Sequence, residues 1–471
     1  MRMRRRDLLL SAGSAVLLPL LGRARQAEAS ETAVSLEAAP GRVQLVGRSY
    51  PATDVWCYGG QVPGPGLRLR QGERLRVEFA NGLVEATTVH WHGLRIPNGM
   101  DGVPYLTQEP VAPGGRFVYE FDPPDAGTYW YHPHQRSSEQ VGRGLYGPLI
   151  VEEREPPRVD RELVWMLDDW RMTPEAALVD DFDNFHDMSH GGRLGNTVTV
   201  NGVIAESEPV RAGERIRLRL INTANARFFS LGFTDHKPVV IAIDGQPCEP
   251  HEPIGGRVVL GPAMRVDLML DMSGRPGQTF PVIDDFYRNS TYRLLDLAYD
   301  AGPPLREHAL DAPLALPANP LPAPDLASAV RREVRLEGGA MGSLAGARMN
   351  GEFLSIEELV RRAKAWALNG EVAEGHRMPP LLTFRRGQSV VLEIVNDTAF
   401  AHPMHIHGHS FRVLSANGRA LPHGIWQDTV VVNRRERVEV AFVADNPGGW
   451  MFHCHILEHQ AAGMMGVVQV T

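Results

Sequence analysis

The sequence is poor in cysteine, with only Cys57, Cys248 and Cys454 in a chain of 471 residues. So few thiols exclude a small scaffold in which several disulfides take the place of a core. Cys57 and Cys248 could form one bridge between domains, or both could be buried free thiols. Their spacing does not decide between the two arrangements.

An excess of positive charge is also missing. The net charge is -8 and the isoelectric point lies near 6.1. This balance gives no reason to expect nucleic acid or an anionic membrane surface as a partner. Small molecules and cations remain possible substrates.

Long apolar runs are scarce as well. The most apolar stretch, from Leu8 to Leu21, is too short and too interrupted to span a bilayer, so no stable membrane insertion is expected. It lies between a basic head and a small-residue cleavage site that ends at Ala29, which predicts an export signal over residues 1–29. Arg5-Arg6-Asp7-Leu8-Leu9 resembles a twin-arginine signal, so we expect passage through the twin-arginine export machinery and a periplasmic location.

Helical patterns are rare too. The clearest covers residues 354–368, "LSIEELVRRAKAWAL", where Ser355 and Glu358 have the spacing of a capping box. The run rich in Pro and Ala at 314–330 is typical of a linker. A length of 471 residues favours about three domains.

What the chain does contain is one strand pattern in three copies. "GERLRVEFANGL" begins at Gly72, "GERIRLRLINTA" at Gly213 and "GQSVVLEIVNDT" at Gly387. Each copy has a glycine turn, alternating polar and apolar residues, and then Asn. Repeats of this size predict an all-β protein of three consecutive β-sandwiches, with domains at 30–154, 155–313 and 331–471.

The histidines are concentrated in two windows. Of 18 histidines, four lie between residues 90 and 134 and eight between 402 and 459. The motifs are "VHWHG", "YHPHQ", "HPMHIHGHSF" and "FHCHILEH". In the middle repeat, the segment that corresponds to "YHPHQ" and "FHCHILEH" is "RVDLMLDMSGRPGQTFPVID", and it contains no histidine.

The parity of a strand divides these residues into two sets, because side chains two apart share a face and side chains one or three apart do not. His453 and His455 lie on one face and Cys454 on the other. His405 and His407 share a face, which His409 is expected to share, and His402 lies opposite. We expect four H-x-H pairs in one site and His402, Cys454, His459 and Met464 in a second site behind it.

The donor types of the two sets favour copper. Two imidazoles, a thiolate and a weak thioether suit a blue-copper centre better than zinc. Eight imidazoles from two domains could hold about three coppers and leave positions open for a small molecule. One H-x-H pair alone could also be a polar pair of a sheet, but four pairs with a cysteine are not explained in that way.

These motifs resemble those of the multicopper oxidases, the family of laccases, copper-efflux oxidases and bilirubin oxidases, whose three domains are cupredoxin-like Greek-key β-sandwiches or barrels. The resemblance implies four copper ions that pass electrons from a phenolic, aromatic or metal-ion reductant to dioxygen. It implies a type 1 copper in the third domain and a cluster shared with the first domain. The implied type 1 ligands are His402, Cys454, His459 and Met464, the type 2 ligands are His90 and His405, and the type 3 ligands are His92, His132, His134, His407, His453 and His455.

Three further positions bear on the chemistry. Asp101 matches the acid that the family places near the type 2 copper, although an Asp before Gly is also an ordinary turn residue. Gln460 stands where many bacterial relatives have Glu, and an amide cannot deliver a proton as an acid does. The family's copper-efflux members have a Met-rich insert in the third domain, whereas residues 340–380 contain only Met341, Met349 and Met378. Specialised cuprous oxidation is therefore weakly supported.

Other functions stay as alternatives. A copper-free structural relative loses its ligands, and a copper-storage protein has no need of a complete cluster. A copper nitrite reductase has only two cupredoxin domains. The acidic run 180–192, with Asp187, Met188 and His190, could attract a metal-ion substrate, but such runs are more often solvated loops.

Overall fold

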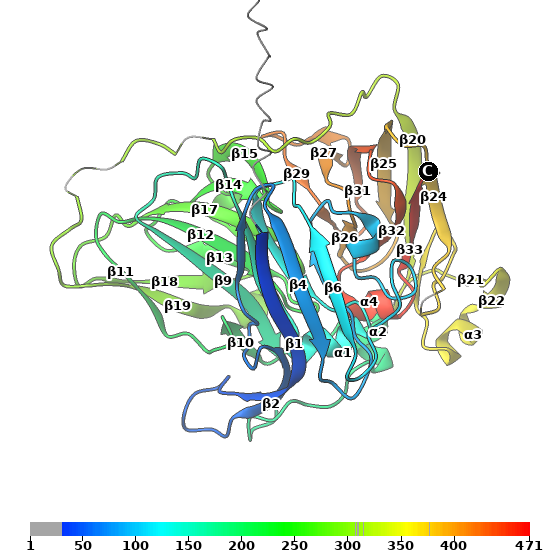
Figure 1. Ribbon diagram of the computed structural model, residues 1–471, viewed down its shortest axis with the longest axis horizontal. Helices are drawn as coiled ribbons and strands as arrows, with labels where there is room; N and C mark the ends of the chain where they lie inside the picture. Colours follow the sequence, from blue (N-terminus) through cyan, green and yellow to red (C-terminus); the bar gives the residue numbers. More distant parts are fainter. Residues whose placement is uncertain (1–30, 307, 309, 314, 376) are drawn as a thin grey trace, which may run out of the picture.

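The computed structural model describes residues 31–306, 308, 310–313, 315–375 and 377–471. The predicted export signal lies outside the described residues. Figure 1 shows three β-rich units packed against one another, coloured blue to cyan, green, and yellow to red along the chain. Within the described ranges, no helix has the length and apolar character needed to cross a membrane.

The first unit is a sandwich of two four-stranded sheets, with the orders β2-β1-β4-β6 and β3-β8-β7-β5. Its strands are β1 (Glu31–Val43), β2 (Thr53–Tyr58), β3 (Leu67–Arg70), β4 (Arg74–Asn81), β5 (His90–His92), β6 (Arg116–Phe121), β7 (Gly127–His132) and β8 (Gly147–Glu152). A 3₁₀ turn, η1 (Asn98–Met100), and a short helix, α1 (Ser137–Gly142), lie in its loops.

The second unit pairs a six-stranded sheet, β10-β9-β12-β17-β14-β15, with a five-stranded one, β11-β19-β18-β13-β16. Its strands are β9 (Arg161–Trp170), β10 (Thr197–Val200), β11 (Ser207–Val210), β12 (Arg215–Asn222), β13 (Phe229–Phe233), β14 (Val239–Ile243), β15 (Gln246–His251), β16 (Val258–Leu260), β17 (Arg265–Asp271), β18 (Thr279–Asp284) and β19 (Tyr292–Tyr299). Its helical turns are α2 (Phe185–Ser189), η2 (Ile254–Gly256) and η3 (Arg288–Ser290).

The third unit pairs the sheet β23-β20-β25-β31-β27-β28, to which β29 adds at β27, with the sheet β24-β33-β32-β26-β30. Its strands are β20 (Val330–Gly338), β21 (Gly346–Met349), β22 (Glu352–Ser355), β23 (Trp366–Leu368), β24 (Pro380–Phe384), β25 (Gln388–Asn396), β26 (His402–Ile406), β27 (Phe411–Ala416), β28 (Arg419–Ala420), β29 (Trp426–Gln427), β30 (Thr429–Val432), β31 (Arg437–Ala444), β32 (Gly448–Cys454) and β33 (Met465–Val470). Its helices are α3 (Ile356–Arg361) and α4 (Leu457–Ala461).

The three copies of the strand pattern form β4, β12 and β25. Each copy pairs in parallel with the first strand of its unit and antiparallel with a later one. Each unit also encloses an apolar core of its own, built around Trp91, Trp165 and Trp450 respectively. The predicted repeat is thus confirmed at the level of pairing, while the domain limits predicted to the residue stay a prediction.

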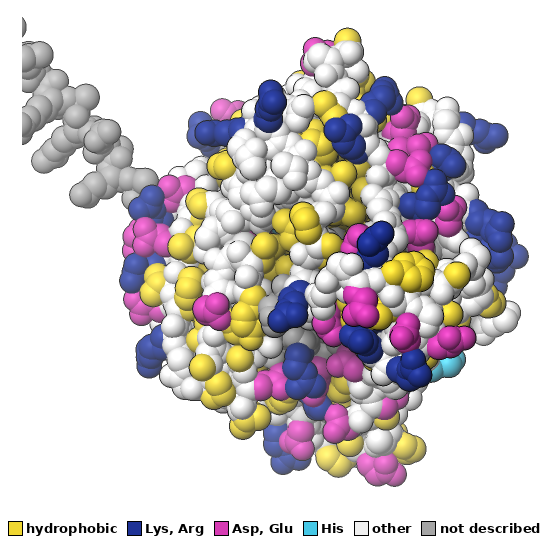
Figure 2. Space-filling view, turned by 90° about the vertical axis from the view of Figure 1, so that its right-hand side faces the viewer, with side chains coloured by type: hydrophobic (Ala, Val, Ile, Leu, Met, Phe, Trp, Pro, Cys, Tyr) yellow, Lys and Arg dark blue, Asp and Glu magenta, His cyan; other side chains and the backbone are white. Residues whose placement is uncertain are grey.

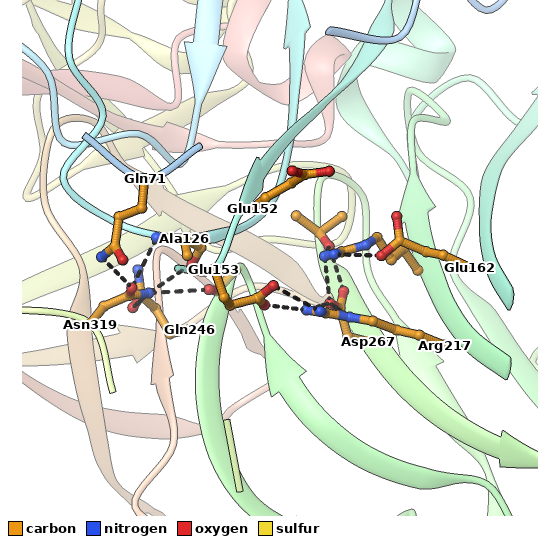
Figure 3. Close-up of polar contacts among 12 residues, drawn as sticks. Gln71, Ala126, Glu152, Glu153, Glu162, Arg217, Gln246, Asp267 and Asn319 are labelled. Atoms are coloured by element: carbon orange, nitrogen blue, oxygen red, sulfur yellow. Dashed lines mark hydrogen bonds and ion pairs between the residues drawn. The ribbon is translucent and has the colours of Figure 1, made fainter. Parts of the chain in front are cut away.

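Polar contacts join the second unit to the first unit and to the following linker, as Figure 3 shows. The buried guanidinium of Arg217 donates to Glu153 at 2.6 and 3.0 Å and to Asp267 at 2.8 Å. Asn319, inside the predicted linker, exchanges two hydrogen bonds with the backbone of Ala126 and donates to Gln246. The linker segment is therefore fixed to both preceding units at this point.

The predicted helix over 354–368 is wrong in most of its length. The capping box of Ser355 and Glu358 is present, but α3 ends at Arg361. Ala363 takes a left-handed backbone conformation, and Trp366–Leu368 pairs with β20 as a strand. Burial of Trp366 in the core overrides the helical periodicity of the segment.

All three cysteines are free and buried, so Cys57 and Cys248 do not form a bridge in this structure. Figure 2 shows charged side chains of both signs spread over one face of the molecule, whereas histidine is nearly absent from that face. Most of the histidines of the two motif windows are instead buried.

Candidate metal centre

The four H-x-H pairs meet between the first and third units. In the first unit β5 pairs with β7, which sets His90 opposite His132. In the third unit β26 pairs with β32, which sets His405 opposite His453. Two pairs of rings from different units stack at 3.9 Å between centroids, His90 on His407 and His92 on His405. The four pairs therefore bring eight imidazoles to one interface.

These eight rings have the spacing of metal ligands. Ligand atoms lie within 4.8 Å of one another in groups that include His90 with His92 and His405, His90 with His132 and His134, His92 with His132 and His455, and His134 with His407 and His453. His407 Nε2 lies 3.2 Å from His453 Nε2. Buried ring nitrogens without any hydrogen-bond partner are His90 Nε2, His92 Nδ1, His132 Nε2, both nitrogens of His134, His405 Nε2 and both nitrogens of His455.

Unpartnered buried nitrogens are costly in a folded protein unless they bind something. Burial, reinforced by neighbouring imidazoles, lowers the pKa of six of these rings well below the ordinary value; they are His92, His132, His134, His407, His453 and His455. The rings are therefore neutral at physiological pH, which is the form that binds a metal. The donor set fits copper, for which imidazole is a suitable ligand.

Asp101 lies beside this cluster, at the end of η1. Its carboxylate Oδ2 is 2.8 Å from His407 Nδ1, and its backbone carbonyl is 2.8 Å from His90 Nδ1. We call the ring nitrogen that points away from the cluster the outer nitrogen. Asp101 thus contacts the outer nitrogen of one ring from the first unit and of one ring from the third unit. Such contacts hold a ligand histidine in one tautomer and one orientation.

The second predicted set lies on the other side of β32. Distances among the donor atoms are 3.4 Å from Cys454 Sγ to His402 Nδ1, 3.6 Å from Cys454 Sγ to His459 Nδ1, and 3.1 Å between the two Nδ1 atoms. Met464 is fully buried in the same apolar cluster as Cys454. Burial lowers the pKa of His459 to about 3, which keeps that ring neutral. The set combines soft and imidazole donors in an enclosed site.

Both histidines of this set have their outer nitrogens engaged. His402 Nε2 lies 2.8 Å from the Thr398 hydroxyl, and His459 Nε2 donates to the carbonyl of His190 at 2.6 Å. His190 follows α2, which packs against α4. Trp366 lies beside both rings and donates its indole N–H to the Met188 carbonyl at 2.6 Å. The α2 segment of the second unit therefore covers the cysteine site.

The expectations for His409, Gln460 and the acidic run 180–192 can be compared with the structure. His409 does not share the face of His405 and His407, because the chain turns at Gly408 (φ 64°) and the His409 ring packs on Phe442 and Trp450. Gln460 is buried with its Oε1 unpartnered. In the acidic run all four carboxylates have partners: Asp181 and Asp187 bond to Arg171, Asp180 to Arg143 and Asp183 to Ser138.

Sequence reasoning missed two residues at the cluster. The Asp428 carboxylate lies 3.2 Å from His92 Nε2, and Arg265 donates to it from the second unit at 2.6 and 2.9 Å. Neither residue belongs to a histidine motif, and 336 positions separate His92 from Asp428. No spacing in a single sequence could have indicated this contact.

Comparisons with known proteins agree with this arrangement. Three family profiles, each described as multicopper oxidase, match residues 41–156, 161–298 and 352–471. The multicopper oxidase MmcO of Mycobacterium tuberculosis is 32% identical over an alignment that covers 96% of this chain and 90% of MmcO. The chain belongs to the multicopper oxidases.

Two solved structures resemble this multicopper oxidase closely. One is a multicopper oxidase from Pseudomonas thermotolerans, with 36% identity, a TM-score of 0.82, and coverage of 94% of this chain and 100% of that chain. The other is Lac15 from a marine microbial metagenome, with 38% identity, a TM-score of 0.73, and coverage of 93% and 100%. The predicted all-β fold of three cupredoxin-type domains is confirmed.

Membership also decides the class of activity. The multicopper oxidase described here is a laccase-like, copper-dependent oxidoreductase that uses oxygen as acceptor and a small reductant such as a phenol or a metal ion. A copper-free structural role and a specialised cuprous oxidase are not favoured. The two sets of histidines supply suitable copper sites for that chemistry.

Proposed function

We propose that the enzyme binds four copper ions and couples the oxidation of phenolic or aromatic reductants to the reduction of dioxygen to water. The observation that supports four sites best is the set of buried imidazole nitrogens without partners. His402, Cys454 and His459 would hold the type 1 copper with Met464 as a weak ligand. His90 and His405 would hold the type 2 copper, and the groups His92, His132, His455 and His134, His407, His453 would hold the type 3 pair.

Bound copper supplies one-electron redox chemistry, so that single electrons from a reductant can be collected for the four-electron reduction of dioxygen. The chain itself connects the two sites through covalent bonds, because Cys454, the last residue of β32, lies between His453 and His455 in the sequence. Asp101 Oδ2 accepts a hydrogen bond from His407 Nδ1, which leaves His407 Nε2 for the cluster. Gln460 stands where an acid would deliver protons, so we assign proton supply to Asp101.

The surroundings of α2, the segment that covers the cysteine site, indicate which reductant the enzyme prefers. A pocket of 430 Å³ lies between α2 and α3, and its lining includes Phe185, His190, Ile356 and Val360. An apolar pocket with imidazole groups suits a planar phenol or aromatic amine. The paired carboxylates of residues 180–187 leave few free oxygen ligands for a metal ion. Together these observations support an aromatic reductant over a metal ion.

Copper content per chain and the visible spectrum test the proposal when the wild type is compared with Cys454→Ser. We expect about four coppers and an intense blue absorption in the wild type, and about three coppers without that absorption in the variant. Oxygen consumption should be faster with a phenol than with cuprous or manganous ions. Wild-type protein that stays free of copper after full loading would overturn the four-copper assignment.

We also propose export through the twin-arginine machinery, with a periplasmic mature chain that begins near residue 30. The basic head, the apolar run and the cleavage site support this location. Replacing both Arg5 and Arg6 by Lys should keep the enzyme in the cytoplasm, as cell fractionation would show. A periplasmic variant of normal yield would exclude this route.

A further inference from the structure

The second domain has no histidine in either metal site, yet one of its arginines reaches the histidine cluster. Arg265 is the first residue of β17, in the repeat copy without histidines, and its side chain is fully buried. It forms a bidentate pair with Asp428, from Nη1 to Oδ1 at 2.9 Å and from Nη2 to Oδ2 at 2.6 Å. Its Nε donates to the carbonyl of Thr128 in the first domain at 3.1 Å. A single side chain therefore links all three domains.

Asp244, also of the second domain, holds the same pair from the other side. Its Oδ1 accepts from the backbone N–H of Arg265 at 2.9 Å. Its Oδ2 accepts from the backbone N–H groups of Asp428 at 3.3 Å and Thr429 at 3.1 Å. The second domain thus fixes both the guanidinium and the main chain that carries the Asp428 carboxylate.

Asp428 in turn faces the outer nitrogens of two cluster histidines. Its Oδ1 lies 3.2 Å from His92 Nε2 and 3.3 Å from His405 Nδ1. Its backbone carbonyl lies 2.9 Å from His405 Nδ1, and the Thr429 hydroxyl donates to its Oδ1 at 2.8 Å. A carboxylate and a carbonyl only accept hydrogen bonds, so each of these ring nitrogens carries a proton.

This arrangement selects a different nitrogen on each ring. With Nε2 protonated, His92 has Nδ1 free, and with Nδ1 protonated, His405 has Nε2 free. These two free atoms are among the buried nitrogens that have no hydrogen-bond partner within the described residues. The stacked rings of His92 and His405 therefore offer opposite nitrogens to the cluster because one carboxylate contacts both.

The glycine that ends the motif "VHWHG" fits the same arrangement. Gly93 has φ +88°, and a Cβ atom at this position would overlap the Arg265 guanidinium and the Asp428 carboxylate. The position next to His92 therefore needs a residue without a side chain, so that the Arg265–Asp428 pair can lie close to β5.

We propose that Arg265 and Asp244 are positioning residues that aim the Asp428 carboxylate at His92 Nε2 and His405 Nδ1, and so set which nitrogen each histidine presents to copper. The inference rests on the proposed function, in which both histidines are copper ligands. In this proposal the second domain contributes no copper ligand but orients two of the ligands. Contacts of this kind are worth about 10- to 100-fold in metal affinity or activity.

The alternative is that Arg265 only joins the domains, and Arg217 offers a matched control for that role. Arg217 is likewise buried and paired with two carboxylates, Glu153 and Asp267, but it forms no hydrogen bond with any histidine that the structure describes. Lysine at either position keeps the charge and loses the bidentate geometry. Any loss of copper affinity or of stability that Arg265→Lys and Arg217→Lys share would reflect domain packing alone.

The test uses the apoprotein and the copper-loaded enzyme. In the apoprotein labelled with ¹⁵N-histidine, nitrogen shifts report the tautomers of His92 and His405. In the loaded enzyme, copper titration and the electron paramagnetic resonance of the type 2 copper report the cluster, while blue absorption reports the Cys454 site. We expect Arg265→Lys to mix the tautomers of His92 and weaken cluster binding by about 10- to 100-fold, with unchanged blue absorption. Arg217→Lys should leave the tautomers and the cluster as in the wild type.

Asp428→Asn gives a second measurement that does not depend on the arginine. An amide N–H directed at His92 Nε2 donates a hydrogen bond and needs an unprotonated ring nitrogen to accept it, so the tautomer of His92 should invert. A single unchanged tautomer in both variants, or equal cluster loss in the Arg217 control, would overturn the proposal. If wild-type protein bound no copper at the histidines, the proposed function would fail, while the tautomers of the apoprotein would still decide whether Asp428 orients the rings.

Discussion

At the scale of single residues, Trp366 connects the cysteine site to its cover. Its ring lies 4.3 Å from His459 and 5.0 Å from His402 between centroids, and its N–H donates to the Met188 carbonyl. Met188 belongs to α2, which precedes the His190 carbonyl that accepts from His459 Nε2. The hydrogen bond of Trp366 therefore helps to hold α2 over the site.

Trp366→Phe tests this role. The variant loses the bond to Met188 and leaves a buried carbonyl unpaired, so the free energy of unfolding should fall by about 1–3 kcal/mol. Backbone amides of α2 should exchange hydrogen faster, because the segment loses one of its contacts with the third domain. Denaturant titration and hydrogen exchange measure the two effects.

Trp450→Phe is the matched control for that measurement. Trp450 is equally buried and donates to the Asn446 carbonyl at 2.8 Å, away from α2. The control should lose similar stability without faster exchange in α2. Equal exchange of α2 in both variants would show that Trp366 does not hold the cover.

How far the sequence predicts the site depends on the kind of residue. The separation of His405 and His453 from Cys454 follows from strand parity, because these residues lie in β26 and β32 with regular alternation. The places of His459 in α4 and Met464 just before β33 do not follow from parity. His409 was placed wrongly, since Gly408 breaks that alternation. Arg265 and Asp428 were missed because their contact depends on how three domains pack, and parity within one strand carries no information about it.

At the scale of elements, the Asn that ends each repeated strand has a defined task. Asn222 closes β12 by donating to the carbonyls of Arg227 at 2.8 Å and Leu260 at 3.1 Å, and it accepts from the N–H of Ala224. Asn81 and Asn396 make the corresponding bonds at the ends of β4 and β25. The sequence repeat therefore reflects a shared loop closure and no role in binding copper.

Asn222→Ala should consequently destabilise the second domain without affecting the metal sites. The change leaves two buried carbonyls and one N–H unpaired, which should lower the free energy of unfolding by about 2–4 kcal/mol. Copper content and blue absorption should match the wild type at temperatures where the variant is folded. A stability loss below about 0.5 kcal/mol would mean that water replaces these bonds.

The helix predicted over 354–368 shows that a local sequence pattern can predict where a helix begins but not where it ends. Local chemistry fixes the start of α3, because the capping box needs only Ser355 and Glu358. The end is decided by Trp366, which enters the core between β20 and the cysteine site. Periodicity cannot distinguish an apolar residue of a helix face from one that belongs to the next strand.

At the scale of the whole molecule, carboxylates hold the second domain against the first. Glu162 at the start of β9 bonds to Arg219 of its own domain and to Arg68 of the first. Burial raises the pKa of Glu162, but Arg219 and Arg68 outweigh it and lower the pKa to about 2. The folded state therefore favours the charged form more than the unfolded chain does.

The sign of the pH dependence follows from that shift. Stability from Glu162 is fully present above its ordinary pKa of 4.5 and is lost as the pH falls from 4.5 towards 2. Because Arg68 is half exposed, the contribution is discounted for solvent screening to about 1–2 kcal/mol. Urea unfolding of the apoprotein at pH 7 and near pH 3 should show this loss in the wild type, and Glu162→Gln should remove that part of it.

Glu208→Gln provides the control for acid unfolding, because burial raises the pKa of Glu208 and its effect therefore has the opposite sign. That variant should keep the loss of stability between pH 4.5 and pH 3. If Glu162→Gln unfolded with the same pH dependence as the wild type, the Arg68 contact would contribute nothing to the interface. The buried pairing of Arg217 with Glu153 would then be a stronger polar link between the first and second domains than the Glu162 contact, since water screens it far less.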